Sequence, residues 1–290
     1  MRKTGCGPER KVLMERTLLK LACVQLLPKA AKRDTYAHIR ELIGTVPNGT
    51  DLVVLPEMWN GPYDSKRFPD FAEPEGGPSM QFLSALAKEK RVYLCGGSIA
   101  ERDGDRVYNT AYVFDPDGRC VAKHRKMHLF DIDVTGGQRF FESDTLSPGD
   151  SPTVFDTPFG KIGVCICYDL RFPELIRLTV DAGAKILLVP AAFNMTTGPA
   201  HWELLFRCRA VDNQIFTVGA APARDGTASY RSWGHSIVCS PWGDVLAEAD
   251  ETECVLSAGL DLGLVDRVRG ELPVLRHRRT DLYRLERIRP

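Results

Sequence analysis

The chain carries no net charge, because its 38 Lys and Arg residues are balanced by 38 Asp and Glu residues. A balanced charge removes the electrostatic argument for nucleic acid or an anionic membrane as the main partner. The sequence also lacks an apolar run long enough to span a bilayer. Neither the phosphate-binding pattern G-x-x-x-x-G-K-S/T nor the dinucleotide-binding pattern G-x-G-x-x-G occurs. We therefore expect no nucleic-acid or membrane partner and no nucleotide cofactor.

A secretory signal is missing as well, since residues 1–16 are polar and basic and have no apolar core. We expect these residues to form a flexible extension, although an organelle-targeting signal or a start at Met14 fits the same composition. The nine cysteines are odd in number, and most lie in apolar runs typical of strands. Buried, reduced thiols explain this pattern better than a disulfide framework, so we expect a cytoplasmic protein.

Strand-like runs alternate with helix-like runs, in an order that occurs twice. The first half has strands at Leu18–Leu26, Asp51–Leu55 and Val92–Gly97, helices at Asp34–Val46 and Pro78–Lys90, and a hairpin of Asn109–Phe114 with Cys120–Lys123. The second half has strands at Lys161–Cys167, Lys185–Pro190 and Ile215–Ala220, helices at Pro173–Ala182 and His201–Asn213, and a hairpin of Gly234–Cys239 with Val245–Glu248. This order predicts an α/β protein whose two layered halves pack as one domain.

The last thirty residues or so form a different kind of segment. The stretch from Asp261 to Pro290 is rich in arginine and is interpreted as a helix followed by an extended arm. Such an arm can reach a partner subunit or lie solvated on the surface. We therefore expect one domain over residues 17–290 that ends in this arm.

The first candidate for chemistry is Glu57, which directly follows the apolar run DLVVL and Pro56. Ligands bind at the carboxyl ends of strands in α/β sheets, so a carboxylate at this place can serve a site. Taken alone, Glu57 is better interpreted as a glutamate of an exposed loop.

The second candidate is the basic stretch HRKMHL, which contains Lys126. A solvated cluster of charges is the alternative interpretation. His124 and His128 are four residues apart, as metal ligands can be, but no third and fourth ligand follow at a recognised spacing. We therefore expect no metal site.

The third candidate is Cys167, at the end of the run KIGVCIC and just before a helix. A thiol at such an elbow points toward the active-site end of a sheet. The first N–H groups of the helix can lower its pKa and face a developing oxyanion. An inert buried thiol is the alternative for Cys167 taken alone.

The three stretches together carry a resemblance that none carries separately. The order PE, HRKxHL and CYDxRFPE resembles the carbon–nitrogen hydrolase, or nitrilase, superfamily over Leu18–Tyr283. Within it, the chain is similar to the Nit-type omega-amidases, and a sister amidase that acts on deaminated glutathione shares much of the pattern. The supporting stretches are HLFDID, FES, LSPGD, FNMTTGPAHWELL, RAVDNQ, ASYRSWGHS and RTDLY. With the repeated halves, the resemblance implies a four-layer α-β-β-α sandwich that associates through helix faces into a homodimer or higher oligomer.

The resemblance implies a Glu-Lys-Cys triad at Glu57, Lys126 and Cys167. Amide hydrolysis needs a nucleophile, a proton shuttle and an oxyanion partner, which these three residues can supply with water as co-substrate. The backbone N–H of Tyr168 is expected to assist Lys126, and Glu142 matches the glutamate that supports the lysine in the family. No cofactor is required.

The resemblance and the chemistry also suggest how an amide substrate is bound. Arg171 follows the nucleophile by four residues and can grip a carboxylate through two hydrogen bonds, or else pair structurally with Asp169 or Glu174. Phe193 and Thr197 match positions that line the omega-amidase pocket. These side chains suit a short dicarboxylate monoamide such as α-ketoglutaramate or succinamate.

Two other hypotheses remain open. A papain-type hydrolase would use a histidine base, for which His128, His201 and His235 are candidates, but papain-like flanks around the cysteine are missing. A non-catalytic binding protein of the superfamily is the second, although such proteins usually lose a triad residue.

Overall fold

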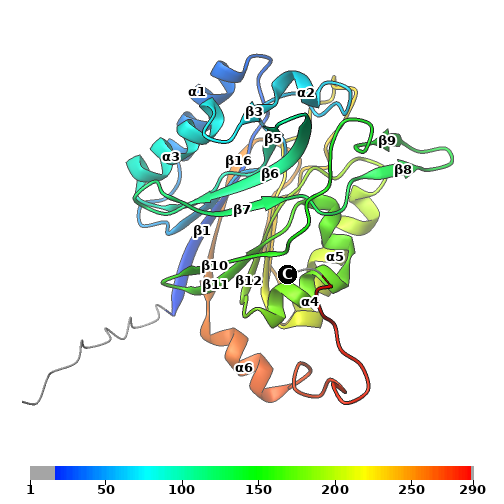
Figure 1. Cartoon of the computed structure of the whole chain (residues 1–290). Helices are drawn as coiled ribbons and strands as arrows, with labels where there is room; N and C mark the ends of the chain where they lie inside the picture. Colours follow the sequence, from blue (N-terminus) through cyan, green and yellow to red (C-terminus); the bar gives the residue numbers. More distant parts are fainter. Residues whose placement is uncertain (1–16, 289–290) are drawn as a thin grey trace, which may run out of the picture.

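The computed structural model describes residues 17–288, so the expected extension at residues 1–16 lies outside the described part. Two β-sheets pack against each other in the middle of the molecule, and helices cover their outer sides (Figure 1). This arrangement is the α-β-β-α sandwich that the sequence predicts. Within residues 17–288, no helix is long and apolar enough to cross a membrane.

The first sheet has eight strands in the order β16-β1-β2-β4-β6-β5-β3, with β7 paired to β6. Its central strands β1, β2 and β4 are parallel, and β16 returns from the other end of the chain to pair antiparallel with β1. The strands are β1 (Leu18–Gln25), β2 (Leu52–Val54), β3 (Glu73–Pro74), β4 (Tyr93–Cys95), β5 (Ile99–Asp103), β6 (Arg106–Phe114), β7 (Cys120–Arg125) and β16 (Cys254–Asp261).

The second sheet has six strands in the order β10-β11-β12-β13-β14-β15, of which β11, β12 and β13 are parallel. Its strands are β10 (Thr153–Thr157), β11 (Gly160–Val164), β12 (Ile186–Pro190), β13 (Phe216–Ala220), β14 (Ile237–Cys239) and β15 (Val245–Glu248). A separate hairpin of β8 (Asp131–Asp133) and β9 (Arg139–Phe141) projects from the body (Figure 1).

Helices α1 and α3 lie outside the first sheet, and α4 and α5 lie outside the second (Figure 1). Proline stands at the start of α3, α4 and α5, where its missing N–H costs no helical hydrogen bond. The helices are α1 (Lys32–Gly44), α2 (Phe68–Phe71), α3 (Pro78–Lys90), α4 (Pro173–Asp181), α5 (Gly198–Asn213) and α6 (Gly263–Glu271), with a 3₁₀ turn over Cys167–Arg171.

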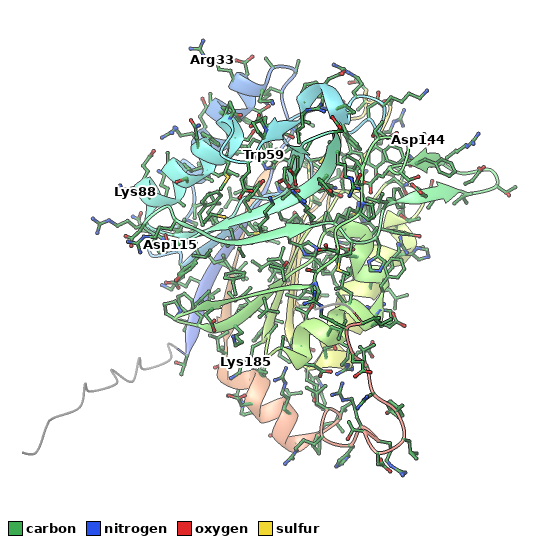
Figure 2. The ribbon with its side chains drawn as sticks, in the orientation of Figure 1. Arg33, Trp59, Lys88, Asp115, Asp144 and Lys185 are labelled. Atoms are coloured by element: carbon green, nitrogen blue, oxygen red, sulfur yellow. The ribbon has the colours of Figure 1, made fainter. Side chains whose placement is uncertain are left out.

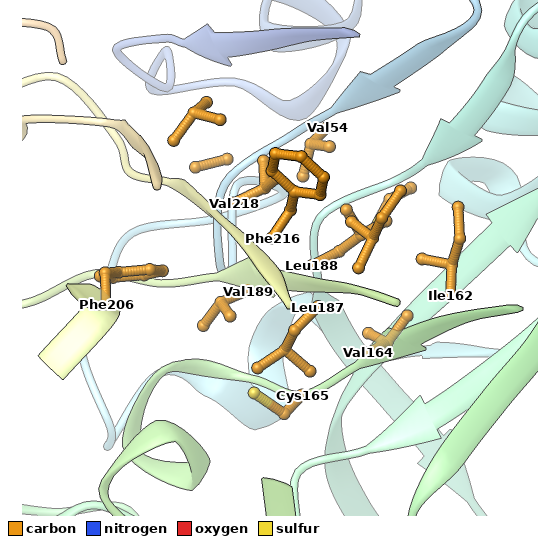
Figure 3. Close-up of a cluster of buried hydrophobic side chains, with 14 of the residues drawn as sticks. Val54, Ile162, Val164, Cys165, Leu187, Leu188, Val189, Phe206, Phe216 and Val218 are labelled. Carbon is orange, nitrogen blue, oxygen red and sulfur yellow. The ribbon is translucent and has the colours of Figure 1, made fainter. Parts of the chain in front are cut away.

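The core between the sheets explains why β2 and β12 are apolar along their whole length. Val54 of β2 lies close to Phe216 and Val218 of β13 (Figure 3), and all three belong to one buried cluster. All five residues of β12 are buried. Parallel strands that are covered on both faces need apolar residues at every position, so alternation is absent there.

The structure corrects the sequence analysis at several elements. Strand β11 ends at Val164, whereas the predicted strand runs on to Cys167. Strand β16 and the β8–β9 hairpin were not predicted. These strands have mixed burial, so their sequences show neither a continuous apolar run nor strict alternation.

Candidate active site

Glu57 lies just beyond the end of β2 and is 2% exposed. The loop that holds it depends on Gly97, whose φ is +64° and whose missing Cβ would lie 2.0 Å from the Pro56 carbonyl oxygen. This close approach lets the Ser98 N–H donate to the Pro56 carbonyl at 3.1 Å. Trp59, labelled in Figure 2, anchors the same loop by donating from its indole N–H to the Gly96 carbonyl at 2.6 Å.

Lys126 directly follows β7, and its side chain is fully buried. Its ammonium donates to Glu57 Oε1 at 2.8 Å and to Glu142 Oε1 at 2.9 Å. Asn109 of β6 fixes both ends of this arrangement: its carbonyl accepts the Lys126 N–H, and its side-chain amide donates to Glu57 Oε1, each at 2.8 Å. The basic stretch is therefore no solvated cluster at Lys126.

Glu142 follows β9 and is buried. Its Oε2 accepts the Phe130 N–H at 2.8 Å, while its Oε1 accepts the Tyr63 hydroxyl at 3.1 Å in addition to the lysine. The unpredicted β8–β9 hairpin thus places the carboxylate that the resemblance assigns beside Lys126.

Cys167 begins the 3₁₀ turn and has a φ of +47°, a left-handed conformation that is uncommon for a residue with a side chain. Its thiol interacts with the Glu57 carboxylate and with the backbone N–H of Ala192, and it lies within electrostatic reach of Lys126. Burial, followed by the negative charge of Glu57, raises the pKa of this thiol well above its usual value. In the resting site the pKa of the thiol is thus raised where a lowered one was expected, because desolvation and Glu57 outweigh Lys126 and the Ala192 N–H.

One ammonium between two buried carboxylates makes the site rich in proton acceptors. Burial works against the charge of Lys126, but the carboxylates of Glu142 and Glu57 outweigh it and raise the lysine's pKa, which keeps the ammonium charged. Burial raises the pKa of Glu142, against the opposing charge of Lys126. Glu57 Oε2 is buried and has no aligned hydrogen-bond donor among residues 17–288. A proton acceptor with a free oxygen therefore lies beside a protonated thiol.

The N–H of Tyr168 stands at the start of the turn. The first hydrogen bond of the turn runs from the Asp169 N–H to the Ile166 carbonyl at 3.0 Å, so the Tyr168 N–H precedes the hydrogen-bonded part. An N–H in this place can donate to an oxyanion formed at the adjacent Cys167.

The three residues expected to bind substrate are placed differently from one another. Arg171 forms no ion pair with a carboxylate among residues 17–288; its guanidinium donates to His201 Nδ1 at 3.2 Å and lies 4.9 Å from the centre of the Phe193 ring. Structural pairing with Asp169 or Glu174 is therefore not what the structure shows. The Thr197 hydroxyl donates to Asn194 Oδ1 at 3.1 Å, so its proton is used within the loop before α5.

A cavity of about 440 Å³ reaches Glu57 from the surface. Loops after β1, after β2 and between β13 and β14 line it, and Tyr63, Ala192 and Tyr230 are among its lining residues. Arg171, Phe193 and Thr197 are not part of its lining. The rings of Tyr63 and Tyr230 are 4.3 Å apart and also border a second, more open hollow under the β8–β9 hairpin.

The sequence analysis missed several residues of the site. Asn109 and Tyr63 carry no local signal, because an amide in a strand and a tyrosine in a loop are ordinary features. Tyr230 and Asp169 lie within the stretches that carry the resemblance, but Tyr230 was given no role and Asp169 was considered only as an ion-pair partner of Arg171. Asp169 accepts hydrogen bonds from His124 and His128, which explains their spacing without a metal.

Known proteins resemble this chain in sequence and in fold. Residues 20–270 match the carbon-nitrogen hydrolase family. The omega-amidase NIT2-A of Xenopus laevis is 53% identical over 268 residues, or 92% of this chain and 97% of that protein. The human omega-amidase NIT2 is 50% identical over 275 residues, or 94% of this chain and 100% of that protein. Saccharomyces cerevisiae Nit3, a member of branch 10 of the nitrilase superfamily, is similar in structure, with a TM-score of 0.84, 42% identity and coverage of 91% of this chain and 97% of that one.

Proposed function

The chain belongs to the carbon-nitrogen hydrolase family and hydrolyses amides, and from this premise we propose that Cys167, Glu57 and Lys126 carry out the reaction. The observation that carries the proposal is the buried Lys126 ammonium, held 2.8 Å from Glu57 and within electrostatic reach of the Cys167 thiol. The raised pKa of the thiol makes a neighbouring base necessary, and Glu57 is the carboxylate that contacts it.

In the proposed first step, Glu57 takes the thiol proton while the sulfur bonds to the amide carbon. Lys126 and the Tyr168 N–H stabilise the oxyanion. Glu57 then gives its proton to the nitrogen, the C–N bond breaks, and ammonia leaves a thioester. Water loses a proton to Glu57 and attacks the thioester, after which the acid leaves and the proton returns to sulfur. Glu142 holds Lys126 in place throughout.

For the substrate we propose a short dicarboxylate monoamide, α-ketoglutaramate or succinamate. Support comes from Arg171, which has no carboxylate partner of its own and lies within electrostatic reach of Cys167. A guanidinium without a carboxylate partner can bind a substrate carboxylate through two hydrogen bonds. Phe193 packs beside it and can contact the methylene chain, while Thr197 can join only if its hydroxyl leaves Asn194.

A second candidate substrate is deaminated glutathione. The cavity of about 440 Å³ falls within the size range that holds drug-sized ligands, which exceeds the need of a five-carbon amide. Ammonia release from ω-amides, compared with hydrolysis of deaminated glutathione, separates the two. Faster turnover of deaminated glutathione than of α-ketoglutaramate would assign the chain to the sister activity and leave the Cys167 mechanism unchanged.

A papain-type mechanism has less support, because each candidate histidine is engaged elsewhere. His128 donates to Asp169, His201 accepts from Arg171, and the ring of His235 stacks on Trp233. Replacement of each histidine tests this: a loss of activity as complete as that of a Cys167 variant would favour a histidine base.

We further propose a homodimer or larger homo-oligomer that works in the cytoplasm. Leu204 and Val211 of α5 are 57% and 46% exposed, which suits a helix face that packs on another copy. The eight cysteines of the described part are all free thiols, as a reducing compartment would leave them. A monomer in light scattering would contradict the proposed oligomer. Recovery of the protein in an organelle fraction would contradict the proposed cytoplasmic location.

A further inference from the structure

The carboxylate of Asp169 is fully buried two residues after Cys167, and the proposed reaction does not use it. Its Oδ1 accepts the backbone N–H of His128 at 2.9 Å, the His128 Nδ1–H at 2.8 Å and the Met127 N–H at 3.2 Å. Its Oδ2 accepts His124 Nε2–H at 3.0 Å and the Ile166 N–H at 3.1 Å. Both oxygens therefore accept hydrogen bonds. Taken together, their donors come from two segments, one around Lys126 and one just before Cys167.

These two segments are the ones that carry the proposed catalytic side chains. Residues on both sides of Lys126 donate to Asp169. On the other segment, Ile166 directly precedes Cys167, whose left-handed backbone needs support from its surroundings. The Asp169 N–H also donates to the Ile166 carbonyl at 3.0 Å, so Asp169 closes the turn from both its backbone and its side chain.

We infer that Asp169 is a positioning residue, which fixes the Cys167 turn against the Lys126 segment and so sets where the thiol stands relative to Lys126 and Glu57. The inference rests on the proposed function of these three residues. Small displacements matter at such a place, because an error of about 1 Å in a reacting group can cost on the order of a hundredfold in rate.

The chemistry of the carboxylate explains why an amide cannot replace it. A carboxylate accepts at both oxygens, whereas asparagine turns one of them into a donor. Since Oδ1 faces the His128 N–H and Oδ2 faces the Ile166 N–H, either orientation of asparagine sets an NH₂ group against a backbone N–H. Burial alone would raise the pKa of Asp169, but hydrogen bonds from His124 and His128 hold it well below its usual value, which keeps the carboxylate charged.

The test compares Asp169→Asn with Glu73→Gln. Glu73 is also a buried carboxylate, and it accepts the N–H and the hydroxyl of Ser79 at the start of α3, without a contact to either catalytic segment. Melting temperatures are measured first, then kcat and KM for succinamate well below both melting temperatures. The rate of Cys167 alkylation by iodoacetamide is followed by mass mapping across a pH series.

For Asp169→Asn we expect kcat to fall by about a hundredfold with KM changed by less than about threefold, and the pH profile of alkylation to shift. Glu73→Gln should lose thermal stability but keep kcat within about twofold. The inference is overturned if Asp169→Asn keeps a wild-type kcat and pH profile, or if the two variants lose kcat equally at equal folded fraction.

A second pair of variants serves if Asp169→Asn fails to fold. The His128 ring is partly exposed and stacks on Phe172 at 3.6 Å. His128→Phe keeps a ring on Phe172 but removes the Nδ1–H donor, so kcat should fall about three- to tenfold. His128→Asn places an amide N–H near the position of the Nδ1–H, so its kcat should return toward the wild-type value. Equal rates for both variants and wild type would overturn the inference. Because alkylation needs no substrate, an inactive wild type would refute the proposed function while this readout still tests the positioning role.

Discussion

Two ion clusters lie on the two faces of the β6–β7 ribbon, and they differ in how many cations stand beside each buried carboxylate. In one, the buried carboxylate of Glu101 accepts hydrogen bonds from Lys123 at 2.5 Å and from Arg125 at 2.7 and 2.9 Å. The same two cations also pair with the exposed carboxylates of Glu75 and Asp103. In the other, the single ammonium of Lys126 lies between Glu57 and Glu142. The buried carboxylate of the first cluster has two cations beside it, whereas the two buried carboxylates of the second cluster share one cation.

Strand geometry separates the clusters, although their members are adjacent in sequence. Successive residues of a strand point to opposite faces. Thr110 therefore donates to Glu101, while Asn109 donates to Glu57. In the same way, Arg125 belongs to the first cluster and Lys126 to the second.

The proportions decide what each cluster can do. Burial alone would raise the pKa of Glu101, but the hydrogen bonds from Arg125 and Lys123 lower it to about 2, which leaves a saturated ion pair. Burial raises the pKa of Glu142 despite Lys126, and one oxygen of Glu57 has no aligned donor. The second cluster thus has a carboxylate, that of Glu57, which can accept a proton from the neighbouring Cys167 thiol.

The strongest test of the comparison removes the thiol that contacts only the second cluster. Cys167→Ala should lower kcat by on the order of 10⁴-fold or more, because no other group can form the thioester. The fold should persist, since alanine leaves the turn and its hydrogen bonds in place, and circular dichroism and the melting temperature check this. If Cys167→Ala, purified free of wild-type enzyme, turned over substrate at the wild-type rate, the covalent mechanism would be ruled out.

The next test replaces one lysine of each cluster by methionine, in two separate variants. Lys126→Met should lower kcat about a hundredfold or more by removing the positive charge that stabilises the oxyanion. Lys123→Met, the matched control, should keep kcat within about twofold, because Arg125 still neutralises Glu101. Steady-state kinetics on folded protein decide it, and equal losses from the two variants would show that the clusters do not differ in function.

A smaller effect is expected at the proposed carboxylate-binding group. Arg171→Lys should raise KM for α-ketoglutaramate about tenfold, since an ammonium cannot reproduce the two parallel hydrogen bonds of a guanidinium. Hydrolysis of a neutral amide such as propionamide should be slow and nearly unaffected. If KM rises as much for the neutral amide, Arg171 supports the site and does not bind the substrate carboxylate.

The smallest effect on activity is expected at Glu101, where the change concerns stability. Its pKa is about 2 in the folded protein against a usual 4.5, so its contribution is present above pH 4.5 and is lost as the pH falls toward 2. Wild type should exceed Glu101→Gln in free energy of unfolding by about 1–2 kcal/mol near neutral pH, which is less than the full pKa shift implies because solvent screens the partly exposed Lys123 and Arg125. Denaturant titrations should show this gap closing in acid, with kcat within about twofold at pH 7; a gap independent of pH would contradict the ion-pair interpretation.

Local patterns explain which parts of the fold could be predicted. Helix α3 runs from Pro78 to Lys90 as predicted, because its proline start and apolar spacing are both local. Strand β16 escaped prediction because its pairing with β1 joins the two ends of the domain. The β8–β9 hairpin escaped prediction for a different reason. Its apolar residues are only partly buried, so its sequence shows no clear strand pattern.

The sequence by itself determined the residue types of the site and the elements that bear them. Glu57 follows a buried strand, Lys126 follows the second strand of a hairpin, and Cys167 lies in a strand-to-helix connection. Each of these features is local. Only the tertiary structure decided the protonation balance, because a pKa depends on burial and on charges that meet across long stretches of chain. It gave Lys126 two carboxylates, raised the pKa of the Cys167 thiol, and joined both segments at Asp169, where one buried carboxylate accepts donors that no sequence pattern pairs.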